Sequence, residues 1–393
     1  MTSTSTNPSS STHHPPAPRR PEDRFVDDIL DLCEGTRARA DLRSGLGRPL
    51  ERCGRMDRYL ARRLSTAMSP EAVRARYVLA ALIAARPRSA REAKTTAPSG
   101  TVLMLDWPAR RARANLGASL AKAVNDGVVK PGSVEDDLLA MAYISLDGVY
   151  QRLPGLTERL QTKDIAIDWA VLLRDLTFWA SDRDAVVTSW QTAYYQACSR
   201  TEPAESQPVK RQPADFVDRV IDLCAGSTAA RSDLETGLGL PVERCHRMHR
   251  HLIPLLPERL HPDDRRAHYA TAALIASRPP AARRPTAAEE ATAPAHRRRL
   301  DLGACLAHAV RDGVFKPESA ERDLHLLSRQ NLPALHERLP ALARRLQGKR
   351  IRVDWDRLLD DLAWWSRDYE QIAARWMDSY FLIRSRDERK NAQ

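Results

Sequence analysis

The sequence predicts an all-α protein made of two tandem helical-bundle modules, each with about eight or nine helices. Three observations support this fold class. Leucine, alanine and arginine dominate the composition while glycine is sparse, with 16 glycines in 393 residues, and Ala, Leu and Arg are among the best helix formers. Apolar residues recur at helical spacing. Finally, one half of the chain repeats the other, and a chain of this length can bury two separate cores.

The repeat extends over nearly the whole chain, with an offset of 191–192 residues early and 186 later. Its matching segments are Phe25–Asp27 with Phe216–Asp218, Gly45–Gly47 with Gly237–Gly239, Tyr77 with Tyr269, Leu116-Gly117 with Leu302-Gly303, Asp126–Val128 with Asp312–Val314, and Asp168-Trp169 with Asp354-Trp355. The change of offset falls between Arg86 and Arg111, where we expect a surface loop, because loops tolerate changes in length. So long a period indicates two whole domains rather than solenoid units.

Five segments follow from this repeat. We expect a disordered tail over residues 1–22, a first module over 23–198, a linker over 199–213, a second module over 214–386 and a short tail over 387–393. The first segment is rich in Ser, Thr and Pro and lacks an apolar core, which is typical of a disordered lead-in rather than a signal peptide.

The early turns and helices of the two modules have recognisable boundaries. The segments Gly45–Pro49 and Gly237–Pro241 are expected to be turns between helices, with Pro49 and Pro241 at the first position of the next helix. They do not match phosphate-binding loops, because neither the third glycine of a dinucleotide fingerprint nor a Gly-Lys-Ser/Thr sequence is present.

The last part of each module predicts two further helices. Asp168 and Asp354 are placed to cap the N-terminus of the helix that begins at the following tryptophan. In the first copy this helix has one apolar face, formed by Trp169, Leu172, Leu173, Leu176 and Trp179. A second apolar stripe, at Val186, Trp190 and Tyr194, predicts the next helix.

The charge of the chain favours a polyanionic partner. The formal net charge is +11, and the excess is shared, with 30 Lys and Arg against 25 Asp and Glu in residues 1–210 and 32 against 26 in the remainder. Basicity therefore belongs to the folded parts, and nucleic acid is a better match than a membrane. No stretch approaches the roughly 20 apolar residues of a membrane span. The six cysteines form no CxxC pair, so we expect reduced thiols and a cytoplasmic location.

No arrangement of residues predicts catalysis, a cofactor or a metal site. Cys245 and His249 have a spacing at which they could share zinc, but the first copy has Cys53 and Asp57 there, a poor ligand set. Repeated carboxylates, Asp137 with Asp323 and Asp175 with Asp361, occur singly beside arginines, and we expect them to form salt bridges. The protein is therefore predicted not to be an enzyme.

Arginines recur in register in the two copies, and we expect them to contact phosphates, because the guanidinium fork matches phosphate oxygens bidentately. The predicted nucleic-acid-binding residues are Arg39, Arg43, Arg52, Arg55, Arg111, Arg113, Arg152 and Arg159 in the first copy, and Arg231, Arg244, Arg247, Arg297, Arg299, Arg338 and Arg345 in the second.

The order of these features resembles the CasB small-subunit family of the type I-E CRISPR Cascade complex. The resemblance rests on a Tyr-then-Ala/Leu segment ending in proline, a Leu-Gly segment and an Asp-Trp segment followed by a last tryptophan. In the first copy these are Tyr77–Pro87, Leu116-Gly117, and Ile165–Trp179 with Trp190, and in the second they are Tyr269–Pro279, Leu302-Gly303, and Ile351–Trp365 with Trp376.

The resemblance implies a non-catalytic, all-α subunit of a crRNA-guided surveillance complex that acts in antiviral defence. Its implied partners are crRNA, target DNA including the displaced strand, and the other Cascade subunits, CasA, CasC and their relatives. Base pairing reads the sequence in such complexes, so the subunit is expected to contact the backbone only. The chain departs from the family pattern at Ala118 and Ala304, where the family often has arginine, and at Glu235, which stands where the first copy has Arg43.

A second function remains open from the residues alone. A free-standing, sequence-independent DNA- or RNA-binding helical scaffold would have the same charge and no reactive centre. Such a protein would bind duplex DNA strongly without partner subunits, whereas a Cascade subunit would co-purify with the rest of its complex.

Overall fold

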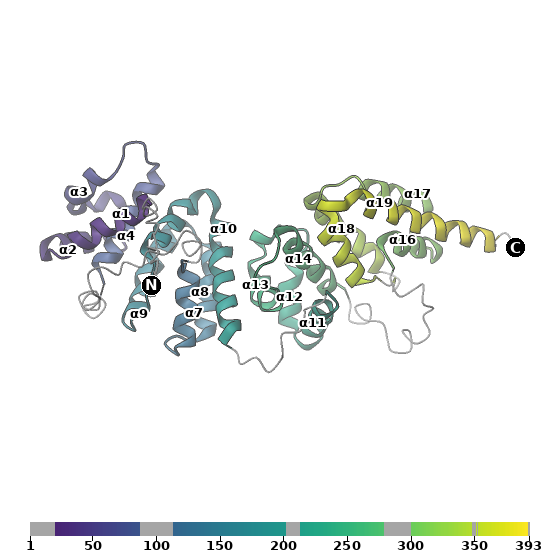
Figure 1. The fold of residues 1–393 in the computed structure, drawn as a ribbon, viewed down its shortest axis with the longest axis horizontal. Helices are drawn as coiled ribbons and strands as arrows, with labels where there is room; N and C mark the ends of the chain where they lie inside the picture. Colours follow the sequence, from purple (N-terminus) through teal and green to yellow (C-terminus); the bar gives the residue numbers. More distant parts are fainter. Residues whose placement is uncertain are drawn as a thin grey trace, which may run out of the picture. The chain divides into compact units, whose positions relative to one another are not determined.

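The computed structural model describes residues 20–86, 113–201, 213–278, 300–347, 351 and 353–391. These residues form helices and contain no strand, which confirms the predicted all-α fold (Figure 1). They divide into two compact units, one of Met1–Val128 and Ile144–Arg183 and the other of Val129–Tyr143 and Asp184–Gln393. None of the described helices is long and apolar enough to cross a membrane.

Each helix of the first copy has a counterpart in the second. The first copy contains α1 (Pro21–Leu32), α2 (Thr36–Arg43), η1 (Leu50–Arg52), α3 (Gly54–Leu60), η2 (Ala61–Arg63), α4 (Pro70–Ala84), α7 (Leu116–Asn125), α8 (Pro131–Tyr143), α9 (Leu146–Gln161) and α10 (Trp169–Thr201). The second contains α11 (Pro213–Gly226), α12 (Thr228–Glu235), η3 (Val242–Arg244), α13 (His246–Leu252), η4 (Ile253–Leu255), α14 (Pro262–Ala276), α16 (Leu302–Arg311), α17 (Pro317–Leu327), α18 (Leu332–Gln347) and α19 (Trp355–Asn391). With eight α-helices described in each copy, the predicted number is confirmed.

The predicted boundaries fall close to the ends of these helices or outside the described residues. Most of the tail predicted over 1–22 lies outside them, and α1 begins at Pro21. Of the linker predicted over 199–213, residues 202–212 lie outside them. The last helix continues to Asn391, beyond residue 386.

The Asp-Trp helices are capped as predicted. The Asp168 carboxylate accepts a hydrogen bond from the Val171 amide at 3.1 Å, and the Asp354 carboxylate accepts one from the Arg357 amide at 3.0 Å. Each cap satisfies one of the amide groups that have no partner at a helix start. In both copies the helix bends at an aspartate with non-helical backbone angles, Asp182 or Asp368, so α10 and α19 each consist of two helical segments, as the two apolar stripes predict.

The glycine-containing segments are turns, but the helices after them differ from the prediction. Gly47 and Gly239 have φ angles of +66° and +71°, a left-handed conformation that glycine adopts without steric cost. Pro49 and Pro241 precede short 3₁₀ helices and stand at their N-cap positions instead of opening an α-helix. A 3₁₀ turn is the tighter solution where only four residues separate the proline from the next α-helix.

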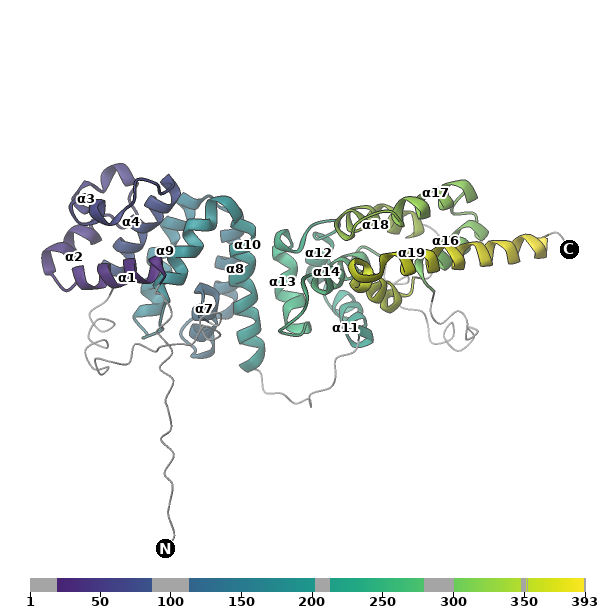
Figure 2. The same ribbon diagram turned by 45° about the horizontal axis from the view of Figure 1, so that its top comes forward.

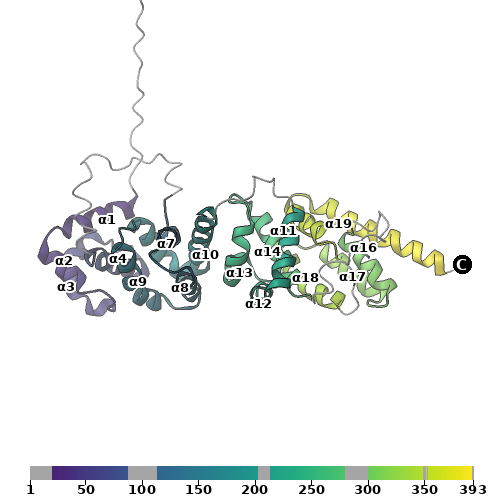
Figure 3. The ribbon, with the colours of Figure 1, turned by 90° about the horizontal axis from the view of Figure 1, so that it is seen from below.

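The unit that contains Asp184–Gln393 is built around α19, against which both α14 and α16 pack (Figure 3). Its core includes the fully buried Trp365, Trp376 and Tyr380. Gly303 of α16 lies directly against the backbone of α19, since a Cβ atom at this position would be 1.8 Å from the Trp376 carbonyl oxygen. The Leu-Gly sequence therefore permits this close helix contact.

Two helical segments of the first copy belong to this same unit. Helix α8 and the part of α10 after Arg183 cluster with the second copy, and α8 contacts α13. Within the other unit, α1 and α2 pack against α4, and α3 packs against α2 (Figure 2).

Candidate nucleic-acid interface

Residues 36–63 form the most arginine-rich part of the described chain, and we call this segment the α2–η2 corner. It contains nine arginines and three acidic residues. Eight of the nine side chains are exposed, namely Arg37, Arg43, Arg48, Arg52, Arg55, Arg58, Arg62 and Arg63, while Arg39 is half-buried. Of the predicted residues, the corner therefore brings together Arg39, Arg43, Arg52 and Arg55.

One side of α3 is buried, and the arginines lie on its exposed side. Met56 and Leu60 are fully buried, whereas Arg55 and Arg58 project into solvent. Gly45 lies against Met56, since a Cβ atom there would be 2.2 Å from the sulfur. The Tyr77 hydroxyl donates a hydrogen bond to Asp57 at 2.8 Å, which ties α3 to α4.

Few of these guanidinium groups are neutralised. Arg58 lies 3.9 Å from Asp41, and Arg63 lies 3.4 Å from Asp28. By contrast, Arg48, Arg52 and Arg55 form no ion pair with any residue in the described part of the chain. Their forks are available for a ligand such as phosphate.

The corresponding segment of the second copy, residues 228–255, has a different character. It contains four arginines and three acidic residues. Arg244 is exposed and Arg231 half-buried. Arg247 and Arg250 both approach Asp233, which is buried. Burial alone would raise the pKa of Asp233, but hydrogen bonds from His251 and Arg250 lower it below the usual value.

Helix α13 of this segment is covered by α8 and α10. The Nδ1 atom of His246 lies 3.3 Å from the Gln191 side-chain oxygen, and its Nε2 atom lies 3.6 Å from Asp184. At the far end of α10, the Arg200 guanidinium binds Glu258. His246 and His249 are buried, while their counterparts in α3, Gly54 and Asp57, are exposed.

His249 belongs to a chain of hydrogen bonds whose direction can be assigned. Thr188 donates its hydroxyl proton to the Glu243 carbonyl oxygen at 3.2 Å, so its oxygen accepts from His249 Nε2 at 3.2 Å. His249 Nδ1 then accepts from the Tyr269 hydroxyl at 2.8 Å. The Cys245 thiol donates to the Pro241 carbonyl oxygen. The two residues with zinc-compatible spacing are thus engaged in other hydrogen bonds, and no group of three potential ligands occurs in the described residues.

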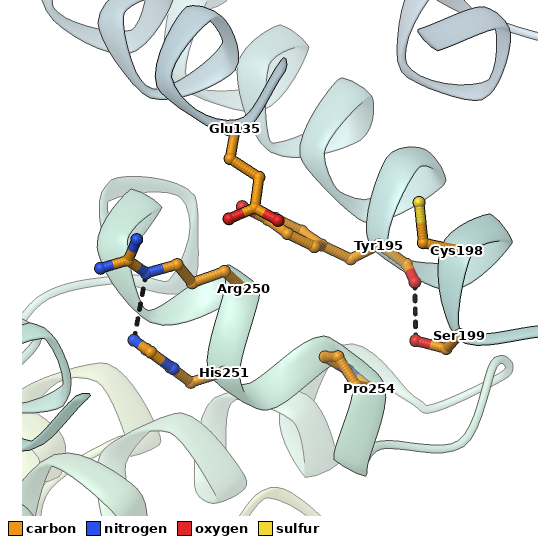
Figure 4. A pocket seen from close by; sticks show the side chains of 7 residues that line it. All are labelled: Glu135, Tyr195, Cys198, Ser199, Arg250, His251 and Pro254. Atoms are coloured by element: carbon orange, nitrogen blue, oxygen red, sulfur yellow. Dashed lines mark hydrogen bonds between the residues drawn. The ribbon is translucent and has the colours of Figure 1, made fainter. Parts of the chain in front are cut away.

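A pocket of about 440 Å³ remains where α8 and α10 meet α13 and η4 (Figure 4). Glu135 and Tyr195 lie on one side of it, and Arg250, His251 and Pro254 lie on the other. It is open and offers few free polar groups, since Arg250 and His251 are already held by Asp233. We assign it no role.

Arg113 is bound within its own unit. Its guanidinium donates to both oxygens of Asp168, with Nη2 at 2.6 Å from Oδ1, and its Nη1 atom lies 2.6 Å from Asp23. Burial alone would lower the pKa of Arg113, but the hydrogen bonds to Asp168 and Asp23 raise it. Through these hydrogen bonds the Arg113 guanidinium joins the start of α10 to α1. We therefore leave Arg113 out of the proposed interface.

The remaining predicted arginines are distributed elsewhere. Arg152, Arg159 and Arg338 are exposed on α9 and α18. Arg345 pairs with Asp323 and stacks on Phe315, with its guanidinium carbon 3.9 Å from the ring centroid. Arg111, Arg297 and Arg299 lie outside the described residues. The predicted salt bridges of Asp323, Asp175 and Asp361 are confirmed.

Matching the arginines in pairs revealed only one part of the asymmetry between the two copies, the replacement of Arg43 by Glu235. Pairing selects the positions that both copies share and ignores arginines found in only one. A count of charges over residues 36–63 and 228–255 would have revealed it. The exposure of two aromatic side chains at equivalent positions, Phe178 and Trp364, was also not predicted. Each of them directly precedes the buried tryptophan of the same helix.

The fold and this surface define a class of protein: an all-helical tandem repeat with exposed, unpaired arginines. The chain matches the family described as CRISPR-associated protein Cse2 over residues 38–195 and again over 230–381. It therefore belongs to the Cse2 family, in which Cse2 is another name for the CasB small subunit. It carries two copies of the family's module.

Chains of two solved complexes are similar to this one. One chain of a "CRISPR RNA-guided surveillance complex, pre-nicking" is 34% identical, with 46% of this chain and 97% of that chain covered and a TM-score of 0.40. A chain of another CRISPR RNA-guided surveillance complex is 31% identical, with 46% and 96% covered and a TM-score of 0.38. No curated protein matches the chain.

Proposed function

We propose that this protein is a non-catalytic, nucleic-acid-binding small subunit of a crRNA-guided Cascade-type surveillance complex. It holds crRNA and target DNA, including the displaced strand, through exposed arginines, and it binds the other Cascade subunits. The observation that carries this proposal is the match to the Cse2 family in both copies.

The chemistry of the surface supports the same function. Arginines such as Arg52, Arg55 and Arg338 are exposed and present forks that suit phosphate oxygens. The carboxylates that could have suggested a nuclease are occupied, since Asp361 binds Arg357, Arg375 and the Trp376 indole. Backbone contacts of this kind position nucleic acid without reading its sequence.

Reconstitution tests the proposal. The complex is assembled from its other subunits and crRNA, with and without this chain, and the binding of a matching DNA duplex is measured. We expect the chain to co-purify with the complex, its omission to weaken target binding, and the purified chain with Mg²⁺ to leave single and double strands intact. Failure to associate, combined with tight binding of the free chain to any duplex, would instead identify a free-standing scaffold.

A further inference from the structure

We propose that the two copies bind nucleic acid unequally, and that the α2–η2 corner of the first copy is a phosphate-binding surface that the second copy lacks. This inference rests on the proposed function and specifies which surface performs it. The ligand is the sugar–phosphate backbone of a nucleic-acid strand.

The equivalent helices α13 and α3 differ in what covers them. In the second copy, α13 is a docking face for protein, because His246 contacts Asp184 and Gln191, and His249 contacts Thr188. All three partners belong to the part of α10 after Arg183, which lies in the same compact unit as α13. The matching helix of the first copy, α3, keeps Gly54, Asp57 and Arg58 exposed.

The two segments also differ in the number of their arginines. Five arginines of the corner have uncharged or acidic counterparts in the second copy. Arg37, Arg43, Arg48, Arg62 and Arg63 correspond to Ala229, Glu235, Leu240, Pro254 and Leu255. The net formal charge is therefore +6 in residues 36–63, from nine arginines and three acids, and +1 in residues 228–255, from four and three.

The arginines that both segments share have different acidic neighbours. Asp233 is buried and gathers Arg247, Arg250 and His251 around it. Its counterpart Asp41 is half-buried, accepts a hydrogen bond from Tyr59 and lies 3.9 Å from Arg58. Arg55, the counterpart of Arg247, has no acidic partner in the described part of the chain. Acidic side chains of the same segment thus neutralise the shared arginines strongly in the second copy and weakly in the first.

Three arginines of the corner are spaced about one helical turn apart. Arg55, Arg58 and Arg62 stand three and four residues apart along α3 and η2, so they lie along one side of that helical segment. Arg48 and Arg52, in the preceding turn and in η1, are exposed as well. Several cations along one side of a short segment can contact successive phosphates of a single strand, which is how strands are bound without sequence preference.

The experiment compares two variants of the full chain that have the same reduction in charge. One carries Arg48→Gln, Arg52→Gln, Arg55→Gln and Arg62→Gln. The control carries Arg259→Gln, Arg322→Gln, Arg329→Gln and Arg386→Gln, four exposed arginines of the second copy. Binding to a mixed-sequence single-stranded oligonucleotide is followed by fluorescence anisotropy from 50 to 200 mM salt, and circular dichroism checks that both variants are folded.

The corner variant should bind more weakly and lower the slope of log K against log salt by about 0.7 for each phosphate that is no longer neutralised, or about 3 for four phosphates. The control should keep a slope within about one unit of the unchanged chain. If the control weakens as much as the corner variant, the corner has no special role although the chain binds nucleic acid. If the unchanged chain does not bind at all, the proposed function fails as well. Should the quadruple variant unfold, Arg52→Gln with Arg55→Gln is compared with Arg322→Gln and Arg329→Gln.

Discussion

His249 and its counterpart Asp57 occupy equivalent positions but have opposite surroundings. Asp57 is exposed and accepts a hydrogen bond from Tyr77, whereas His249 is fully buried between Tyr269 and Thr188. Burial, reinforced by the nearby His246 and Arg265, lowers the pKa of His249 to about 3. The imidazole is therefore neutral in the folded protein, as the direction of its hydrogen bonds requires.

This lowered pKa makes folding stability depend on pH. Below an unfolded-state pKa of about 6.5, the unfolded chain binds a proton that the folded chain excludes, so stability is full above that pH and falls as the pH drops toward 3. The decrease is about 1.4 kcal/mol per pH unit, or about 2 kcal/mol between pH 6.5 and 5.

We predict that His249→Gln, which retains a donor and an acceptor but does not titrate, will remove this contribution. Urea unfolding at pH 7 and pH 5 should show a smaller decrease in stability for the variant than for the unchanged chain. His325→Gln, at an exposed position of α17, serves as the control and should behave like the unchanged chain. Parallel pH profiles for all three proteins would contradict the prediction.

The sequence is sufficient to predict roles that are local and insufficient for roles that depend on tertiary partners. The caps at Asp168 and Asp354 depend only on the residues that follow them, and they were predicted correctly. The Arg113 bridge could not be predicted in the same way, because Asp23 is 90 residues away. The hydrogen bonds of His249 also depend on a distant residue, Thr188, which is 61 positions earlier.

At the scale of helices, two glycines that look alike in the sequence have different surroundings in the structure. Gly303 lies in the contact between α16 and α19, where a Cβ atom would be 1.8 Å from a backbone oxygen that has no freedom to move aside. Gly155 lies exposed in α9, with no atom within 4 Å of a Cβ placed there. The sequence marks both residues only as glycines within helical patterns.

We predict that the same substitution will change stability in opposite directions at these two sites. Gly303→Ala should destabilise the protein by about 3 kcal/mol or more, because α16 and α19 must separate. Gly155→Ala should stabilise it by about 0.5–1 kcal/mol, because alanine loses less entropy in a helix. Chemical unfolding followed by circular dichroism measures both. An equal effect at the two positions would show that α16 and α19 are not in close contact.

The existence of the helices was predictable from apolar periodicity, but their packing partners were not. The stripe at Val186, Trp190 and Tyr194 predicts a helix with one buried face. It does not predict that Thr188 and Gln191, between those positions, are buried against α13 of the second copy. Polar residues on a helix face ordinarily indicate solvent, but here His246, His249 and the Glu243 carbonyl oxygen bind them.

At the scale of the whole molecule, the repeat predicts that one chain takes the place of two separate small subunits. Both copies match the Cse2 family. The linker predicted over 199–213, about 15 residues, spans at most roughly 50 Å when extended, so only neighbouring sites are within reach. A tether of this length raises the effective concentration of the second copy toward the millimolar range without adding any contact.

Native mass spectrometry of the reconstituted complex should therefore detect one copy of this chain, and two copies would disprove the arrangement. A protease site inserted near Pro208 allows the tether to be cut. The fragments should stay together at micromolar concentration, because Thr188, Gln191 and Arg200 still contact His249, His246 and Glu258, and they should separate on dilution. Thr188→Arg places a charge in the buried contact and should release the cut fragments, while Ser189→Arg, at the exposed neighbouring position, should not. If both variants release the fragments equally, the contact between α10 and α13 does not hold the two copies together.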